Sequence, residues 1–497
     1  MKKTVKQSLI LARAYEQAAG GKIPRDSRPV FHLTPLTGWM NDPNGFSWYH
    51  GQYHLFYQYN PYDTEWDAMH WGHAVSQDLL HWTYLPAALA PDASYDSFGC
   101  FSGSAAELPD GRQLLMYTGV RQEGGDKERE YQTQCIAVGD GKDYVKYGKN
   151  PVLDSDVLPE DLSPYDFRDP KMWRTEDGGY RCVIGARRND KRGVLLLFDS
   201  TDGFEWKYTG VLAENDGRFG LMWECPDFCP LDGKQVLFVS PQDMLPEGFE
   251  YHNGNGTVCL TGRMDGNRFV EEHNQAIDYG IDFYAPQTIL TPDGRRVMIG
   301  WMQNWDTCKT TGYEERPWFG QMSLPRELFL KNGRLYQQPI RELSQYRSGQ
   351  VEYRDVLLDG EKRLEGIEGR VIELDIRLRP ADPGTPYQKF IMKFARDEKY
   401  YSVLSYRPYE SWLQIDRKFS GSRRAYIHQR RCLVSDRQGE IRLYVILDRF
   451  SVEVFINDGE QVMTATILTG SDAKEISFEA DGKVAMDITK YALFDGA

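Results

Sequence analysis

The chain has 497 residues, more than one ordinary hydrophobic core supports, so we expect two domains with a short appended segment. Hydrophobic residues make up 41% and charged residues 27%, a balance that is typical of globular proteins. The formal charge of −14 repels phosphate backbones and anionic lipids, so we expect neither nucleic acid nor a membrane surface as a partner.

Residues 1–30 are predicted to form an N-terminal helical segment. Within it, residues 5–19 have the pattern of a short amphipathic helix that Gly20 and Gly21 end. The apolar run at residues 9–12 is shorter than the roughly seven to fifteen residues of a secretory signal, and no later stretch has the roughly 18 apolar residues of a membrane span. We therefore expect a soluble, cytoplasmic protein.

A weak repeat organises residues 31–340. Turn glycines, most of them preceded by Asp, are each followed by a strand-like apolar run at intervals of about sixty residues. A second marker, an Asp with an aromatic residue four positions later, keeps the same period. The turn glycines are Gly51, Gly111, Gly178, Gly233 and Gly294, and the second markers begin at Asp78, Asp140, Asp202 and Asp265.

Five units of about sixty residues without helical periodicity predict a five-bladed β-propeller over 31–340. The alternative is a large sandwich whose hairpins happen to be evenly spaced. The repeat stops near residue 340, and residues 341–352 are predicted to be a linker. Beyond it, alternating apolar and polar residues, as in 371–376 and 441–447, are typical of half-buried antiparallel strands. Residues 353–497 are therefore predicted to form a β-sandwich, which makes the fold all-β.

The turn glycines also indicate a site. Nine residues before four of them stand Asp42, Ser102, Asp169 and Glu224. Equivalent positions in a propeller lie on equivalent strands around one axis, so the three acids are expected to meet although they are far apart in the sequence. Carboxylates that converge on a cleft suit either glycoside hydrolysis or metal binding.

Metal binding is disfavoured by the residues around these acids. None of the three lies in the Asp-x-Asp spacing of a cation loop, and Arg168 stands beside Asp169 as a counter-charge. The eight cysteines are scattered, and the one close pair, Cys225 and Cys229, lacks nearby His ligands for zinc. Dispersed thiols favour a reducing compartment. Neither a metal nor another cofactor is predicted, and glycoside hydrolysis is the preferred chemistry.

Three blocks of sequence carry a resemblance to a known family. They are Trp-Met-Asn-Asp-Pro-Asn-Gly at 39–45, Phe-Arg-Asp-Pro at 167–170 and Trp-Glu-Cys-Pro-Asp at 223–227. Together they resemble the signature blocks of glycoside hydrolase family 32, the family of invertases, sucrose-6-phosphate hydrolases and fructanases. The resemblance implies a five-bladed propeller followed by a sandwich and a retaining β-fructofuranosidase with a small-molecule sugar substrate.

The resemblance also implies roles for single residues. Asp42 is the implied nucleophile, Glu224 the acid/base and Asp169 the stabiliser of the transition state. The residues that flank Glu224 offer it an apolar setting that is expected to raise its pKa by desolvation, and they are Trp223, Cys225 and Pro226. The implied binding residues, of which the two tryptophans have ordinary packing as their alternative role, are Asn41, Gln58, Trp66, Phe101, Ser102, Arg168 and Trp301.

Several points stay open at the level of sequence. Hydrolysis of sucrose, sucrose 6-phosphate or short fructo-oligosaccharides is the preferred activity, and a fructosyltransferase with the same residues is the alternative. A binding module without activity is disfavoured because all three acids are present. Asp67 stands where the resemblance leads us to expect Gly, which leaves the exact substrate open. The oligomeric state is open too, with the sandwich as a docking surface for a homo-oligomer.

Overall fold

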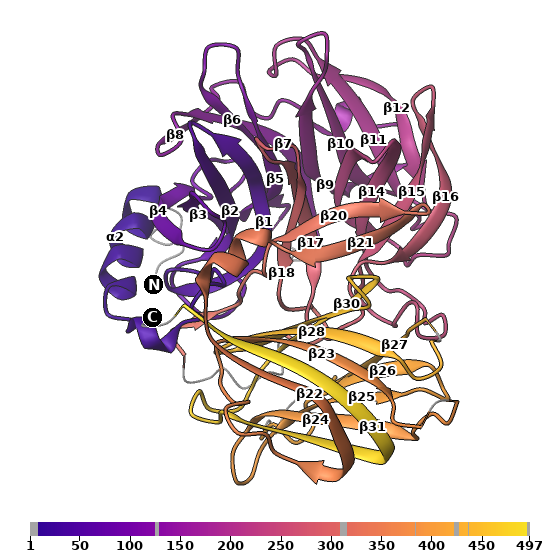
Figure 1. Cartoon of the computed structure of the whole chain (residues 1–497). Coiled ribbons are helices and arrows are strands. Elements are labelled where there is room, and N and C mark those ends of the chain that lie inside the picture. Colours follow the sequence, from indigo (N-terminus) through magenta and orange to yellow (C-terminus); the bar gives the residue numbers. More distant parts are fainter. Residues whose placement is uncertain are drawn as a thin grey trace.

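The computed structural model describes residues 8–124, 129–308, 316–382, 384–421, 427–435 and 437–494. Over these residues, five sheets form a β-propeller and a further ten-stranded sheet forms a sandwich-like domain beside it (Figure 1). The all-β prediction of a five-bladed propeller followed by a sandwich is confirmed. None of the helices in this part of the chain is long and apolar enough to cross a membrane.

Every blade begins with its innermost strand. Each of these strands contacts the innermost strands of the two neighbouring blades, so that together they close a ring around the propeller axis. Their residues are mostly buried because they face neighbouring blades on both sides. The innermost strands are β1 (Gly38–Tyr49), β5 (Gly99–Glu107), β9 (Leu162–Arg174), β13 (Trp223–Leu231) and β17 (Tyr284–Leu290).

The remaining strands of each blade pair antiparallel and lie progressively further from the axis. They are β2 (Gln52–Asn60), β3 (His70–Ser76), β4 (Trp82–Leu89), β6 (Gln113–Gln122), β7 (Glu130–Gly139), β8 (Tyr144–Lys146), β10 (Tyr180–Arg188), β11 (Gly193–Ser200), β12 (Lys207–Glu214), β14 (Lys234–Pro241), β15 (Val258–Asp265), β16 (Arg268–Ala276), β18 (Arg296–Trp301), β20 (Arg326–Lys331) and β21 (Arg334–Pro339). The short strand β19 (Trp318–Phe319) pairs in parallel with β1, which ties the fifth repeat to the first blade.

The two sequence markers correspond to two hairpin turns. All five turn glycines lie between the first and second strands of a blade, and their φ angles of 77° to 88° are the left-handed values that glycine adopts most easily. The Asp–aromatic marker lies between the third and fourth strands of blades one to four. In two of these turns the same hydrogen bonds recur, because Ser76 and Ser200 bond to Asp78 and Asp202, respectively.

The N-terminal segment packs on the first blade. Helix α2 (Leu9–Gly20) lies against β4, where Glu16 accepts a hydrogen bond from the backbone N–H of Ala87 and Arg13 donates one to its carbonyl. The predicted helix at 5–19 is present from Leu9, and positions 5–7 lie outside the described residues. The 3-10 helix η1 (Arg25–Ser27) follows α2, and a second one, η2 (Ser155–Val157), lies in the connection between β8 of the second blade and β9 of the third.

After the propeller, the segment predicted as a linker is divided between the 3-10 helix η3 (Arg341–Tyr346) and the start of β22. The long strands β22 and β31 run through both layers of the second domain, so hydrogen bonds join the layers into one sheet. The strands of this domain are β22 (Arg347–Lys362), β23 (Ile372–Pro380), β24 (Lys389–Arg396), β25 (Ser402–Arg407), β26 (Trp412–Asp416), β27 (Gln429–Leu433), β28 (Ile441–Asp448), β29 (Ser451–Ile456), β30 (Gln461–Thr466) and β31 (Glu475–Leu493).

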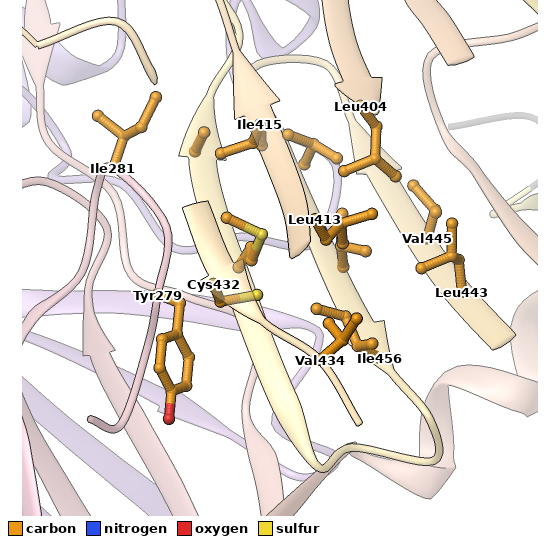
Figure 2. Packing of buried hydrophobic residues seen from close by; sticks show 14 of the residues in the cluster. Tyr279, Ile281, Leu404, Leu413, Ile415, Cys432, Val434, Leu443, Val445 and Ile456 are labelled. Atoms are coloured by element: carbon orange, nitrogen blue, oxygen red, sulfur yellow. The ribbon is translucent and has the colours of Figure 1, made fainter. Parts of the chain in front are cut away.

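One hydrophobic core continues across the junction of the two domains. Tyr279 and Ile281 of the propeller lie in the same buried cluster as Leu413 and Cys432 of the sandwich (Figure 2). The backbone N–H groups of Tyr279 and Ile281 also donate to carbonyl groups of β30. The sandwich is therefore bonded to the segment that leads into β17, the innermost strand of the fifth blade.

Candidate active site

Each innermost strand breaks its regular pairing with the next strand of its blade at the same level of the propeller. Such bulges bend a strand and redirect its side chains, and they are frequent beside active sites. Asp169 and Cys225 adopt left-handed φ angles of 66° and 46° at two of these breaks. The breaks span residues 40–43 in β1, 101–103 in β5, 168–171 in β9, 224–227 in β13 and 284–287 in β17.

The nine-residue spacing identified the right strands but is one residue out of phase in the first blade, where Asn41 rather than Asp42 corresponds to Asp169, and in the fourth blade. There the bulge falls on Cys225 and Pro226, so Cys225 rather than Glu224 corresponds to Asp169. The turn between β13 and β14 is two residues long, whereas the turn between β9 and β10 has five. The shorter turn accounts for the shift in the fourth blade.

The breaks open a cavity of about 650 Å³ at one end of the propeller, which all three predicted acids line. Its remaining described lining is rich in polar side chains, with aromatic rings at the wall. The lining residues are Asn41, Asp42, Gln58, Trp66, Phe101, Ser102, Glu130, Gln132, Tyr165, Asp166, Arg168, Asp169, Arg187, Glu224, Gln242, Asp243, Asn255 and Trp305.

Asp42 of β1 lies at the buried floor of the cavity. Its Oδ2 accepts a hydrogen bond of 2.8 Å from the hydroxyl of Ser102, and the thiol of Cys225 lies 3.6 Å from the same oxygen. Its Oδ1 accepts no hydrogen bond from any described residue. Burial, together with the nearby charge of Glu224, raises the pKa of Asp42 to about 6.

Asp169 of β9 is held by the backbone of the neighbouring blade. Its Oδ2 accepts a 2.9 Å hydrogen bond from the N–H of Cys225, and the Cys225 sulfur lies 3.7 Å away. Burial raises the pKa of Asp169 to about 7 against the opposing charge of Arg168, whose Nε is 4.0 Å distant. Near neutral pH Asp42 and Asp169 therefore retain protons more readily than isolated carboxylates do.

Glu224 has polar neighbours, contrary to the apolar surroundings expected from its flanking residues. Arg168 donates from Nε to Oε1 at 3.0 Å, and the hydroxyl of Tyr284 donates to Oε2 at 2.8 Å. Trp223 instead points into the hydrophobic core, because adjacent residues of a strand point to opposite faces. Cys225, on the other side, turns toward Asp42.

Arg168 is also placed differently from the expectation that it serves Asp169. It pairs with Glu224 and, through Nη1 at 3.2 Å, with Asp166, while Asp169 lies at the limit of ion-pair distance. Arg187, the other arginine of the lining, pairs with Asp166 through Nη2 at 2.6 Å. Carboxylates outnumber arginines in the described lining, and their mutual charge adds to burial, the larger cause, in raising the pKa values of Asp42 and Asp169.

Six of the seven predicted binding residues line the cavity with the acids, and Trp301 does not. Trp301 is fully buried and packs against Trp305, which itself forms part of the wall. Trp66 meets Phe101 edge to face at 5.7 Å between ring centroids. Asp67, although next to Trp66 in the chain, is exposed and is not part of the described lining.

Three functional residues were missed by the sequence predictions, namely Tyr284, Trp305 and Asp166. Tyr284 lies in the segment Asp-Phe-Tyr-Ala at 282–285, to which the sequence predictions assigned no role. Trp305 follows Trp301 by four residues, and nothing in the local sequence tells which of the two faces the cavity. Asp166 precedes Arg168 by two residues, a spacing that puts both side chains on one face of a strand.

The family model described as glycosyl hydrolases family 32 N-terminal domain matches residues 32–339, and the C-terminal model of the same family matches residues 342–493. A raffinose invertase from Escherichia coli is 35% identical over 96% of this chain and 97% of its own length. A sucrose-6-phosphate hydrolase from the same species is 36% identical over 92% of this chain and 93% of its own.

Solved structures agree with the sequence relatives. The family 32 β-fructofuranosidase of Bombyx mori superimposes with a TM-score of 0.82 at 33% identity, covering 99% of both chains. The sucrose-6-phosphate hydrolase of Lactobacillus gasseri gives a TM-score of 0.84 at 28% identity, covering 97% of this chain and 96% of its own.

Proposed function

The chain belongs to family 32 of the glycosyl hydrolases, and on that premise we propose that it is a retaining β-fructofuranosidase. It hydrolyses the terminal β-D-fructofuranosyl bond of sucrose, sucrose 6-phosphate or short fructo-oligosaccharides by double displacement. One observation carries the proposal. Three carboxyl groups from three innermost strands meet in one cavity, and burial raises the pKa of two of them, Asp42 and Asp169, toward neutral pH.

Asp42 is the nucleophile in this proposal. Its Oδ2 is fixed by Ser102, while no described residue hydrogen-bonds to Oδ1, which leaves that oxygen available to attack the anomeric carbon. The attack forms a fructosyl ester and divides one difficult displacement into two easier steps. The role requires the ionised carboxylate, so activity should rise as the pH passes the pKa of about 6.

Glu224 is the acid/base. It donates a proton to the leaving glycosidic oxygen in the first step and takes a proton from water in the second. Asp169, held by the Cys225 N–H, bonds to fructosyl hydroxyls and stabilises the positive charge that develops on the sugar ring.

A labelling experiment tests the mechanism. A mechanism-based fructosyl reagent should attach to the carboxylate of Asp42 in the parent enzyme, as peptide mass spectrometry would reveal, and should not label Asp42→Asn. Methanolysis of sucrose should give methyl β-D-fructofuranoside with retained configuration. Label on Asp169, or an inverted product, would contradict the assignment.

The fructosyltransferase alternative uses the same intermediate, which a second sugar rather than water attacks. Hydrolysis predicts equal amounts of free glucose and free fructose at every sucrose concentration. Transfer predicts a deficit of fructose that grows with sucrose concentration, with kestose-type products in its place. A comparison of sucrose, sucrose 6-phosphate and kestose under identical conditions would also define the substrate preference.

A further inference from the structure

The segment that leads into β17, the strand that begins with Tyr284, is held by hydrogen bonds to the second domain. The backbone N–H groups of Ile281 and Asp282 both donate to the carbonyl of Thr464 on β30, at 2.7 and 3.1 Å. Ile281 lies against the buried cluster of the sandwich (Figure 2). Residues 281 and 282 are therefore fixed by the sandwich immediately before β17 begins at Tyr284.

The carboxylate of Asp282 is fully buried at this anchor. Its Oδ2 pairs with Arg417, which directly follows β26 of the sandwich, at 2.5 Å, and accepts hydrogen bonds from the N–H and hydroxyl of Thr466. Its Oδ1 accepts from the hydroxyl of Thr307 at 3.0 Å. Thr307 lies two residues after Trp305, so the same carboxylate holds the segment that supplies an aromatic wall of the cavity.

Tyr284 lies two residues after Asp282, and its hydroxyl contacts Glu224. It lies 2.8 Å from Oε2 of Glu224 and 3.1 Å from the carbonyl of Ser240, and its ring is fully buried beside Trp301. One hydroxyl between a carboxyl group and a carbonyl can serve both protonation states of Glu224. It donates to the ionised carboxylate, or it accepts from the protonated carboxyl and donates to Ser240.

We propose that Asp282 and Tyr284 are positioning residues for Glu224, and that the sandwich, through Arg417, contributes to holding the general acid in its productive orientation. The inference rests on the proposed role of Glu224. It gives the second domain a part in the chemistry besides its part in stability, because a carboxyl that rotates away from the glycosidic oxygen cannot donate its proton efficiently.

The central test is Tyr284→Phe, which removes only the hydroxyl. Both protonation states of Glu224 then lose a bond, but the ionised carboxylate loses the stronger, charge-assisted one, so the alkaline limb of the kcat/KM profile should move upward by roughly one pH unit. On sucrose, kcat/KM should fall about tenfold or more, whereas an aryl fructoside with a good leaving group should lose less than about threefold. The ratio of the two rates does not depend on the folded fraction, so the test survives partial misfolding.

Asp282→Asn and Asp278→Asn form a matched pair of variants. Asp278 lies four residues earlier and is also buried at the junction, where it pairs with Arg326 and Thr464. Both changes should lower Tm, but only Asp282→Asn should shift the alkaline limb and the ratio of the two substrates. Asp282→Glu keeps a negative charge opposite Arg417. It should therefore restore part of the parent pH profile and part of the parent ratio of the two substrate rates.

The outcomes separate this inference from the proposed function. If Glu224→Gln loses far more activity on sucrose than on the aryl fructoside while Tyr284→Phe and Asp282→Asn behave like the parent, the positioning role is wrong and the acid assignment stands. If Glu224→Gln itself keeps the parent pH profile and rates, the proposed function fails first. Equal shifts in Asp278→Asn and Asp282→Asn would reduce Asp282 to a merely structural role.

Discussion

Asp42 and Asp169 of the cavity are buried, as are Asp448 and Glu453 of the domain junction, but their counter-charges differ. At the junction, Asp448 and Glu453 bond to the two ring nitrogens of His32 at 2.8 and 3.0 Å, and Glu453 also pairs with Arg326 at 2.6 Å. Against the effect of burial, the hydrogen bond from His32 lowers the pKa of Asp448, and the charge of Arg326 lowers that of Glu453.

In the cavity the pKa values of the carboxyl groups are raised instead of lowered. Burial and the charge of Glu224 raise the pKa of Asp42, and burial raises that of Asp169 even beside Arg168. The junction has one partial exception, since burial also raises the pKa of Asp278, which shares Arg326 with Glu453. The contrast teaches that burial alone does not mark a functional acid. A surplus of carboxylates over cations in an open cavity does, because it keeps protons available near neutral pH.

Asp42→Asn would test the contrast most strongly. Because the pKa of Asp42 is raised, its ionised form opposes folding as the pH rises from about 4 to about 6, and removing the charge should not destabilise the protein at pH 7. Turnover of sucrose should be almost abolished, since an amide cannot form the ester. Steady-state kinetics and a thermal melt measure both. A stable variant that still turns over sucrose would exclude Asp42 as nucleophile.

Glu224→Gln should have the next largest effect. Loss of the proton donor should lower kcat on sucrose by about 10² to 10⁴-fold. An aryl fructoside whose leaving group departs without protonation should be cleaved in its first step at nearly the parent rate. Rapid-mixing measurements of that first step, compared with steady-state rates on sucrose, make the distinction. Equal losses on both substrates would contradict the assignment of the acid.

Glu453→Gln should lower stability and leave activity unchanged, whereas Asp42→Asn should do the reverse. The change leaves Arg326 and His32 without their shared carboxylate, and breaking a buried pair costs about 3–5 kcal/mol. The melting temperature should fall by on the order of 10 °C, while KM and the turnover per folded molecule stay near the parent values. If this variant and Asp42→Asn lose similar stability, the contrast between junction and cavity is wrong.

The smallest expected effect is the change of stability with pH that the charge of His32 causes. Burial alone would lower the pKa of His32, but Asp448 and Glu453 raise it to about 9, above the ordinary value of 6.5. The charged imidazole therefore stabilises the fold fully below pH 6.5, and this stabilisation is lost as the pH rises through about 9. Melting curves between pH 6.5 and 9.5 measure the loss. His32→Gln should melt lower at pH 6.5 and show a flatter profile over this range.

The sequence by itself determined the architecture and the strands that carry the site. Gly51 and Gly178 mark hairpin turns that need left-handed φ angles, and such turns depend on local conformation alone. Counting back from these glycines led to β1 and β9, because a strand advances by a fixed rise per residue. The blade count and the cavity position of Asp42, Asp169 and Glu224 followed from local rules of this kind.

Only the tertiary structure decided which partner each side chain meets. Arg168 turns from Asp169 to Glu224 because of a bulge in β9, and Trp305 rather than Trp301 faces the cavity because of how the fifth blade packs. The bond between Tyr284 and Glu224 joins residues 60 positions apart, and that between His32 and Asp448 spans 416. Turn and strand patterns report local conformation, whereas these contacts depend on how distant segments pack against one another, which no local pattern encodes.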